Sequence, residues 1–204
     1  MTLTEIMERV CLQAGLAIPN SYVGSTNRTV MELLTHAHEA GEELNRRAEW
    51  SKTYKDLTVS ASASSVAIPN DFHRLIESAP VTENGADFSP VYPVQSSGAW
   101  RFIEMNPSAQ RYYFISGGTM YFSPAFGADG GLVRYIRKTW IDSSGSYVAK
   151  FAADDNSPVF SGELMALGTL WRYKRAKGLP HEDILAEYEA EFARELLADR
   201  GVLR

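Results

Sequence analysis

Hydrophobic residues in the first part of the chain repeat every three or four positions, which is the period of an α-helix. The stripe comprises Leu3, Ile6, Met7, Val10 and Ala14. Thr2 or Thr4 is suited to cap the start of this helix, while Gly15 and Pro19 end it. Cys11 falls within the apolar pattern, so we expect it to be a small buried residue.

A longer helical pattern follows and extends to about Trp50. Its apolar stripe comprises Val30, Leu33, Leu34, Ala37, Ala40, Gly41, Leu44 and Ala48. Ala37, Ala40 and Gly41 are small, so this face would let another backbone approach closely. We therefore expect contacts between copies of the chain to use part of this surface.

Helical spacing returns near the C-terminus, where Ser161 is a plausible N-cap. One stripe comprises Leu164, Leu167, Leu170 and Trp171, and a second comprises Ile184, Tyr188, Phe192 and Leu196. Gly178 ends the first of these helices, Pro180 opens the second at its first turn, and Gly201 ends the pattern. The end of the chain is thus predicted to be a helical hairpin, with Trp171, Tyr188 and Phe192 packed inside the bundle.

The middle of the chain changes to a period of two, which is typical of β-strands. We predict strands over residues 56–61, 65–68, 101–105, 111–116, 119–123 and 132–138. Gly117 and Gly118 separate two of them and indicate a tight hairpin turn. Residues 69–72 leave the second strand and are expected to start a short turn or helix through Glu77, and residues 81–100 are expected to be a long loop.

These patterns predict an α+β fold in which both ends of the chain form a helical bundle and a small antiparallel β-sheet domain is inserted between them. The expected boundaries are 1–54 for the N-terminal helical part, 55–150 for the β domain and 151–204 for the C-terminal hairpin and tail.

The composition limits what the chain can do. It has 204 residues, a formal net charge of −5 and one cysteine. A modest negative charge is unusual for a free-standing DNA-binding protein, and a single cysteine excludes an internal disulfide. No apolar run is long enough to cross a membrane, and the first residues do not resemble a signal peptide, so we expect the chain to be cytosolic when made.

Residues that could carry chemistry are scattered. The glycines at 127–131 lack the lysine of a phosphate-binding loop, and His36 and His38 lie two apart on a helix, where they cannot readily share one metal ion. Asp154 and Asp155 are the carboxylate pair to test for a hydrolase, although an Asp-rich turn is the simpler interpretation. We therefore predict no catalytic residues, no cofactor and no metal.

A basic cluster at the end of the first C-terminal helix is the most distinctive feature. It comprises Arg172, Lys174, Arg175 and Lys177. Three interpretations remain open: a solvated helix end, pairing with Glu182, Asp183 and Glu187 on the next helix or on a neighbouring subunit, and contact with DNA phosphates. These positions cover more than half of the helix circumference, so they cannot all face one duplex.

Several segments occur in the order found in bacteriophage head–tail adaptor proteins, the family that includes the tail tubular protein A of short-tailed phages. They are residues 45–50 (Asn-Arg-Arg-Ala-Glu-Trp), 67–76 (Ala-Ile-Pro-Asn-Asp-Phe-His-Arg-Leu-Ile), 107–124, which contain Arg-Tyr-Tyr-Phe-Ile-Ser-Gly-Gly, and 151–155 (Phe-Ala-Ala-Asp-Asp) ahead of the basic and acidic hairpin. The ordered set covers nearly the whole chain, which resembles this family.

The resemblance implies a non-enzymatic virion protein at the head–tail junction. Such adaptors form a ring, usually of twelve copies, beneath the portal protein; the ring extends the channel for double-stranded DNA and docks the tail tube or nozzle. The family often contacts the portal through its C-terminus, which here implicates Leu197, Val202, Leu203 and Arg204. The basic cluster with Glu182, Asp183 and Glu187 is the corresponding candidate for contacts between subunits or with the portal.

Two alternatives belong to other classes. One is a peptidoglycan hydrolase that acts at infection, and the other is a small DNA-binding module that uses the basic hairpin. The net charge is unfavourable for the second alternative.

Overall fold

The computed structural model describes residues 1–85 and 89–201 and confirms the α+β class. The chain divides into two compact units. A helical unit contains Met1–Thr53 and Lys138–Arg204, and a β unit contains Tyr54–Arg137. Residues 138–150, which the sequence analysis placed with the β domain, lie in the helical unit. In the part of the chain that the structure describes, no helix is both long and apolar enough to span a membrane.

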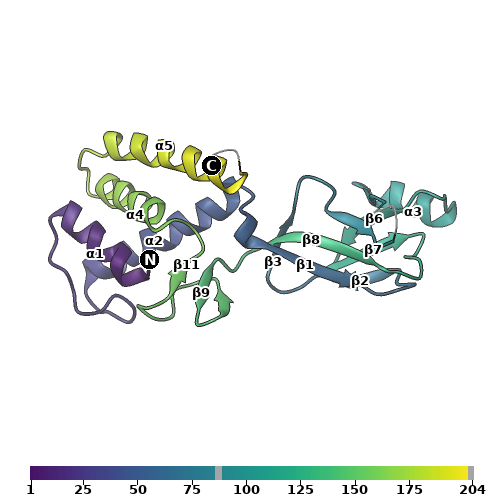
Figure 1. Ribbon diagram of the computed structural model, residues 1–204, viewed down its shortest axis with the longest axis horizontal. Helices are drawn as coiled ribbons and strands as arrows, with labels where there is room; N and C mark the ends of the chain where they lie inside the picture. The colour runs from purple at the N-terminus through teal and green to yellow at the C-terminus, as the bar shows by residue number, and fades with distance from the viewer. Residues whose placement is uncertain (86–88, 202–204) are drawn as a thin grey trace. The chain divides into compact units, whose positions relative to one another are not determined.

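Four helices form the helical unit, and α4 lies at its centre (Figure 1). They are α1 (Leu3–Ala14), α2 (Arg28–Arg47), α4 (Gly162–Ala176) and α5 (Glu182–Asp199). Helix α4 contacts α1, α2 and α5, and ten of its residues are buried. The two ends of the chain therefore build one bundle, as the spacing of hydrophobic residues predicts.

The expected capping chemistry is present at α1, whereas Ser161 occupies the N-cap position of α4 without a side-chain hydrogen bond. Thr2 and Glu5 form a capping box at the start of α1, and Gly15 ends that helix in the left-handed conformation. The second helix ends at Arg47, three residues before the predicted end. The predicted start of α5, at Pro180, was wrong by two residues. The helix begins at Glu182, and His181 occupies the N-cap position.

The small residues of α2 are used within the chain. A Cβ atom placed on Gly168 of α4 would lie 3.1 Å from the Cβ of Ala40, so α2 and α4 approach closely here. At Gly41 the neighbour is the ring of Trp140, which is 1% exposed and lies 2.1 Å from the position of an added Cβ. This face therefore packs inside the helical unit, and it is not the free subunit surface that the sequence suggested.

A small sheet belongs to the helical unit and explains the position of residues 138–150. Its strands are β9 (Ile141–Ser143), β10 (Ser146–Val148) and β11 (Ser157–Pro158), with β9 in the middle. Trp140 and Ile141 enter the core beside Phe151 and Phe160. Buried aromatic contacts thus attach this segment to the helices.

The β unit contains two four-stranded sheets. In the first, β8 (Gly131–Arg137) pairs antiparallel with β1 (Tyr54–Val59), β3 (Phe72–Leu75) and β4 (Val81–Glu83). In the second, the order is β2 (Ser65–Ala67), β7 (Thr119–Ser123), β6 (Tyr112–Ser116) and β5 (Tyr92–Pro93), and β5 is parallel to β6. Gly117 and Gly118 form the predicted β6–β7 turn, both with positive φ.

Three predictions for the β unit were wrong. Residues 101–105 are not a strand but the end of α3 (Ser97–Met105), where Ser96 caps the helix and Trp100 stacks on Phe114. Residues 72–75 form β3 instead of a turn or helix, although the turn itself is present, because the Phe72 N–H bonds to the Pro69 carbonyl. The expected loop over 81–100 contains β4, β5 and the first turn of α3.

Candidate interaction surface

Arg172, the first residue of the basic cluster, is buried instead of facing solvent. It is 8% exposed, forms an ion pair with Glu43 of α2, and donates a 2.6 Å hydrogen bond to the Gly168 carbonyl. Its guanidinium lies 4.3 Å from the centre of the Trp171 ring. A buried guanidinium with two acceptors and an aromatic neighbour has its charge compensated locally.

Glu43 joins three elements of the helical unit. It accepts a hydrogen bond from Arg47 at 3.1 Å, and Arg47 also pairs with Glu189 of α5 at 2.6 Å. The Tyr188 hydroxyl lies near Glu43. Burial is the main cause, and the charge of this carboxylate the second, that raises the pKa of Tyr188 to about 12. The hydrogen bond from Arg47 lowers the pKa of Glu189. Helices α2, α4 and α5 are therefore tied together by charges on α2 that the sequence analysis did not single out.

Lys177, at the other end of the cluster, also pairs with α2. Its Nζ lies 2.5 Å from Glu32, which accepts a second bond from Arg28 at 3.0 Å. Both hydrogen bonds lower the pKa of Glu32, and the one from Lys177 has the larger effect. Pairing of the cluster with acidic side chains was expected, but for Arg172 and Lys177 the structure supplies partners on α2, not on α5.

An open groove of about 500 Å³ lies between α2 and α4. We call it the α2–α4 groove; it is lined by His36, Glu39, Glu42, Glu43, Arg46, Trp171, Arg172, Arg175 and Ala176. Arg46 and Arg175 are exposed and have no ion-pair partner among the described residues. Trp171 is 9% exposed, and its indole N–H has no hydrogen-bond partner in the described part of the chain. The groove thus places the exposed guanidiniums of Arg46 and Arg175 beside the carboxylates of Glu39, Glu42 and Glu43.

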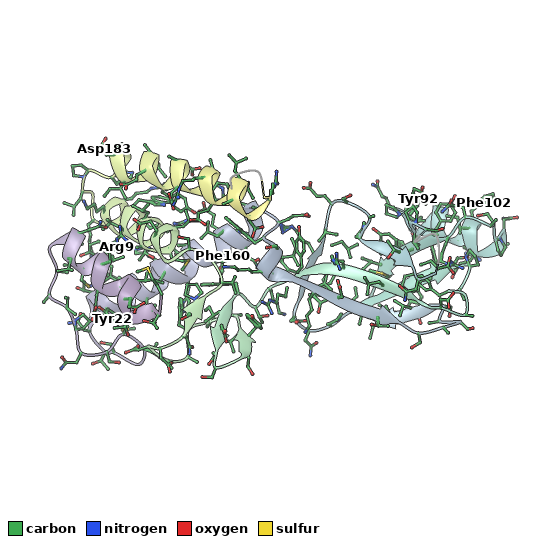
Figure 2. All side chains as sticks on the ribbon, in the orientation of Figure 1. Arg9, Tyr22, Tyr92, Phe102, Phe160 and Asp183 are labelled. Atoms are coloured by element: carbon green, nitrogen blue, oxygen red, sulfur yellow. The ribbon has the colours of Figure 1, made fainter. Side chains whose placement is uncertain are left out.

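The other predicted interface residues lie on both helices of the hairpin. Lys174 is half-buried, and Glu182, Asp183 and Glu187 are exposed on α5. Figure 2 shows Asp183 at the start of α5, at the outer edge of the helical unit. Leu197 is 41% exposed, while the predicted contacts at Val202, Leu203 and Arg204 lie outside the described residues.

The carboxylate pair suggested for hydrolysis has a structural use. Asp154 accepts backbone N–H bonds from Val23 at 2.7 Å and from Tyr22 at 3.0 Å. Burial opposes its ionisation, but these bonds outweigh burial and hold the pKa of Asp154 below its usual range. Asp155 contacts the side-chain amide of Asn156. Asp154 therefore holds the segment at Tyr22 and Val23, which follows α1, in place.

The histidines are also engaged locally. His38 accepts a 3.0 Å bond from the Phe151 N–H and stacks on the Phe151 ring, and His36 lies 2.9 Å from Glu39. His181 lies 3.9 Å from Glu182. Within residues 1–85 and 89–201, no group of three or more His, Cys, Asp or Glu side chains is placed to hold a metal ion.

The helical unit uses its charged side chains to pair helices and to line an open groove. Comparison with known families gives the specific assignment. The chain belongs to the SU10 adaptor protein family, which matches residues 1–202. This match confirms the resemblance to bacteriophage head-to-tail adaptors and supports a structural role; it gives no support to a hydrolase or a DNA-binding module. A search of curated proteins found no match.

Proposed function

We propose that this protein is a head-to-tail adaptor that forms a ring, with twelve copies as the expected number, beneath the portal of a tailed bacteriophage. The ring extends the channel for double-stranded DNA and offers a docking surface to the tail tube or nozzle protein. The observation that carries this proposal is the family match over residues 1–202. In the virion the protein therefore lies at the head–tail junction.

Ring closure requires a head-to-tail contact between different surfaces of identical subunits. The α2–α4 groove and the exposed residues of α5 are our candidates for these two surfaces. The net charge of −5 adds to this picture, because twelve copies sum to a negative annulus that would not retain passing DNA. Leu197 and the residues at 202–204 are our candidates for the portal contact.

The test is to mix the protein with its portal and image the complex by cryo-electron microscopy. We expect copies related by rotation about the portal axis. A single copy bound to the portal, or no binding at all, would contradict the proposal.

A further inference from the structure

One side of α3, in the β unit, carries large apolar side chains that face solvent. Phe102 is 68% exposed and Met105 is 74% exposed, the highest values among the large apolar side chains of the described β unit. Gly98 lies one turn before Phe102, so the three positions share one side of the helix, which we call the α3 outer face. Tyr92 of β5 lies at the same end of the β unit in Figure 2 and is 46% exposed.

The opposite side of α3 already attaches the helix to its sheet. Trp100 is 7% exposed and stacks on Phe114 of β6, with the ring centres 5.6 Å apart. Phe102 and Met105 are therefore not needed for this attachment. Large apolar side chains on two opposite sides are typical of a helix packed between two layers. The sheet is the layer under Trp100, and the α3 outer face fits a second layer that a partner supplies.

The charge of α3 limits the class of partner. Arg101 and Glu104 are the charged residues of this helix, and both are exposed, so the helix has no net side-chain charge. Double-stranded DNA and anionic membranes are bound by surfaces rich in lysine and arginine. An aromatic residue and a methionine beside a few polar groups are instead typical of the centre of a protein–protein contact. The α3 outer face therefore fits an apolar groove on another polypeptide.

We propose that the α3 outer face docks the tail tube or nozzle protein, with Phe102 and Met105 inserted into an apolar groove of that protein. The inference rests on the proposed adaptor function. An adaptor that joins the portal to the tail holds both partners at once, which requires separate surfaces. Our candidates for the subunit and portal contacts all belong to the helical unit, whereas α3 belongs to the β unit. The tail protein is thus the partner left for this face.

Two variants change the α3 outer face without touching the side that packs on the sheet. Phe102→Gln with Met105→Gln removes the apolar side chains and keeps good helix formers. Gly98→Lys leaves both in place and adds a charged chain beside them, where nothing lies within 4 Å of a Cβ. Leu12→Gln with Met31→Gln is the matched control, because it replaces two apolar side chains of the helical unit that are 70% and 54% exposed. Circular dichroism checks that each variant remains folded.

The measurement is a titration of portal–adaptor complexes with the tail tube or nozzle protein, followed by biolayer interferometry. We expect both α3 variants to join the portal like wild type but to bind the tail protein at least about tenfold more weakly. Large apolar side chains at the centre of a contact carry much of its affinity, which is the reason for this expectation. The control variant should bind the tail protein like wild type.

The outcomes separate this inference from the proposed function. If both α3 variants bind the tail protein like wild type, or if the control loses as much affinity as they do, the docking inference is wrong while the adaptor function stands. The inference is also wrong if the α3 variants lose self-association, which would make the face a subunit contact, or lose binding of wild type to phosphatidylcholine vesicles. If wild type binds neither the portal nor the tail protein, the proposed function fails and this inference fails with it.

Discussion

Gly41 shows how one residue determines the packing of the helical unit. The space that a side chain would need at this position is filled by the Trp140 ring, which also stacks on Phe160 at 5.7 Å. Trp140 cannot withdraw without disturbing this aromatic cluster, because Phe151 also packs against it in a T-shaped contact at 5.5 Å. A glycine in the middle of a helix lowers helix propensity, and here close packing is the compensating gain.

We predict that Gly41→Ala lowers stability in spite of its better helix propensity. The added methyl group would overlap the Trp140 ring, and overpacking of this kind costs about 1–3 kcal/mol. Chemical denaturation monitored by tryptophan fluorescence measures the loss. The control is Gly98→Ala, since nothing lies within 4 Å of a Cβ at that helical position. Equal or higher stability for Gly41→Ala would show that the ring moves aside freely.

Single residues also show where sequence patterns stop being informative. Burial of Cys11 and the Thr2 cap were predictable, because they depend on neighbours within one or two turns. The partners of Arg172 and Lys177 were not, because Glu43 and Glu32 lie more than 120 residues away and the pairing depends on how α2 meets α4. The charged residues of α2 can be read from the sequence, but their register against α4 cannot.

Among the elements, α5 is held to the unit by a mixed aromatic and charged contact. Phe192 meets the edge of Trp50 at 5.8 Å, and the Arg47 guanidinium lies 4.2 Å from the Phe192 ring centre. Phe192 is half-buried, whereas Tyr188 is fully buried and Trp171 is 9% exposed. The prediction that these three aromatic residues pack within the bundle is confirmed, with Phe192 at its edge.

Phe192→Ala should therefore cost less than the ~3–5 kcal/mol typical of a fully buried phenylalanine; we expect about 2 kcal/mol. The melting temperature should fall by several degrees, as measured by differential scanning calorimetry. Leu197→Ala on the exposed side of the same helix is the control and should change little. A loss below about 1 kcal/mol for Phe192→Ala would mean that the Trp50 contact contributes little to holding α5.

His38 links α2 to the segment that precedes α4. Burial is the main cause that lowers the pKa of His38, and the positive charge of Lys150 lowers it further. The negative charge of Glu42 has a smaller effect in the opposite direction. The neutral ring accepts the Phe151 N–H, a role that protonation would remove. Because the folded pKa is below the unfolded value of about 6.5, the unfolded state binds more protons in this range.

The contribution of His38 is therefore fully present above about pH 6.5 and is lost as the pH falls below that value. We expect wild type to melt at a lower temperature at pH 5.5 than at pH 7.5. His38→Gln should be less stable at pH 7.5 and show a smaller difference between the two pH values. His181→Gln is the control for the remaining histidines. An unchanged pH dependence in His38→Gln would contradict the assignment.

Elements differ in how well the sequence predicts them. Helices α1, α2, α4 and α5 each span at least three turns, so their period is unambiguous. Helix α3 is short, and the five residues 101–105 (Arg-Phe-Ile-Glu-Met) are too few to distinguish helical spacing from strand spacing. The core position of Trp100, one residue earlier, decides the conformation through its stacking on Phe114, which is a tertiary contact. Strand β3 was missed because the preceding turn signal at Pro69 hides where the strand begins.

At the scale of the whole molecule, the chain combines a mildly acidic total charge with a basic cluster in which two of the four side chains already form ion pairs. Arg172 and Lys177 are paired with α2, which leaves Lys174 and Arg175 as the members without an ion-pair partner among the described residues. Removing all four cations at once would damage the helical unit, since Arg172 is buried among three helices. The question of DNA contact is therefore best tested with Lys174→Ala combined with Arg175→Ala.

We expect the free protein to bind duplex DNA only weakly. Two available cations would release about two counterions, so the affinity should show a slope near −2 or shallower against the logarithm of salt concentration and vanish at physiological salt. Fluorescence anisotropy with a labelled duplex, from about 20 to 200 mM salt, measures both quantities for wild type and the double alanine variant. Micromolar binding at physiological salt that the variant loses, while it still joins the portal, would show that the cluster contacts DNA. If the variant instead keeps its fold but assembles poorly on the portal, the cluster serves assembly, as the groove position of Arg175 leads us to expect.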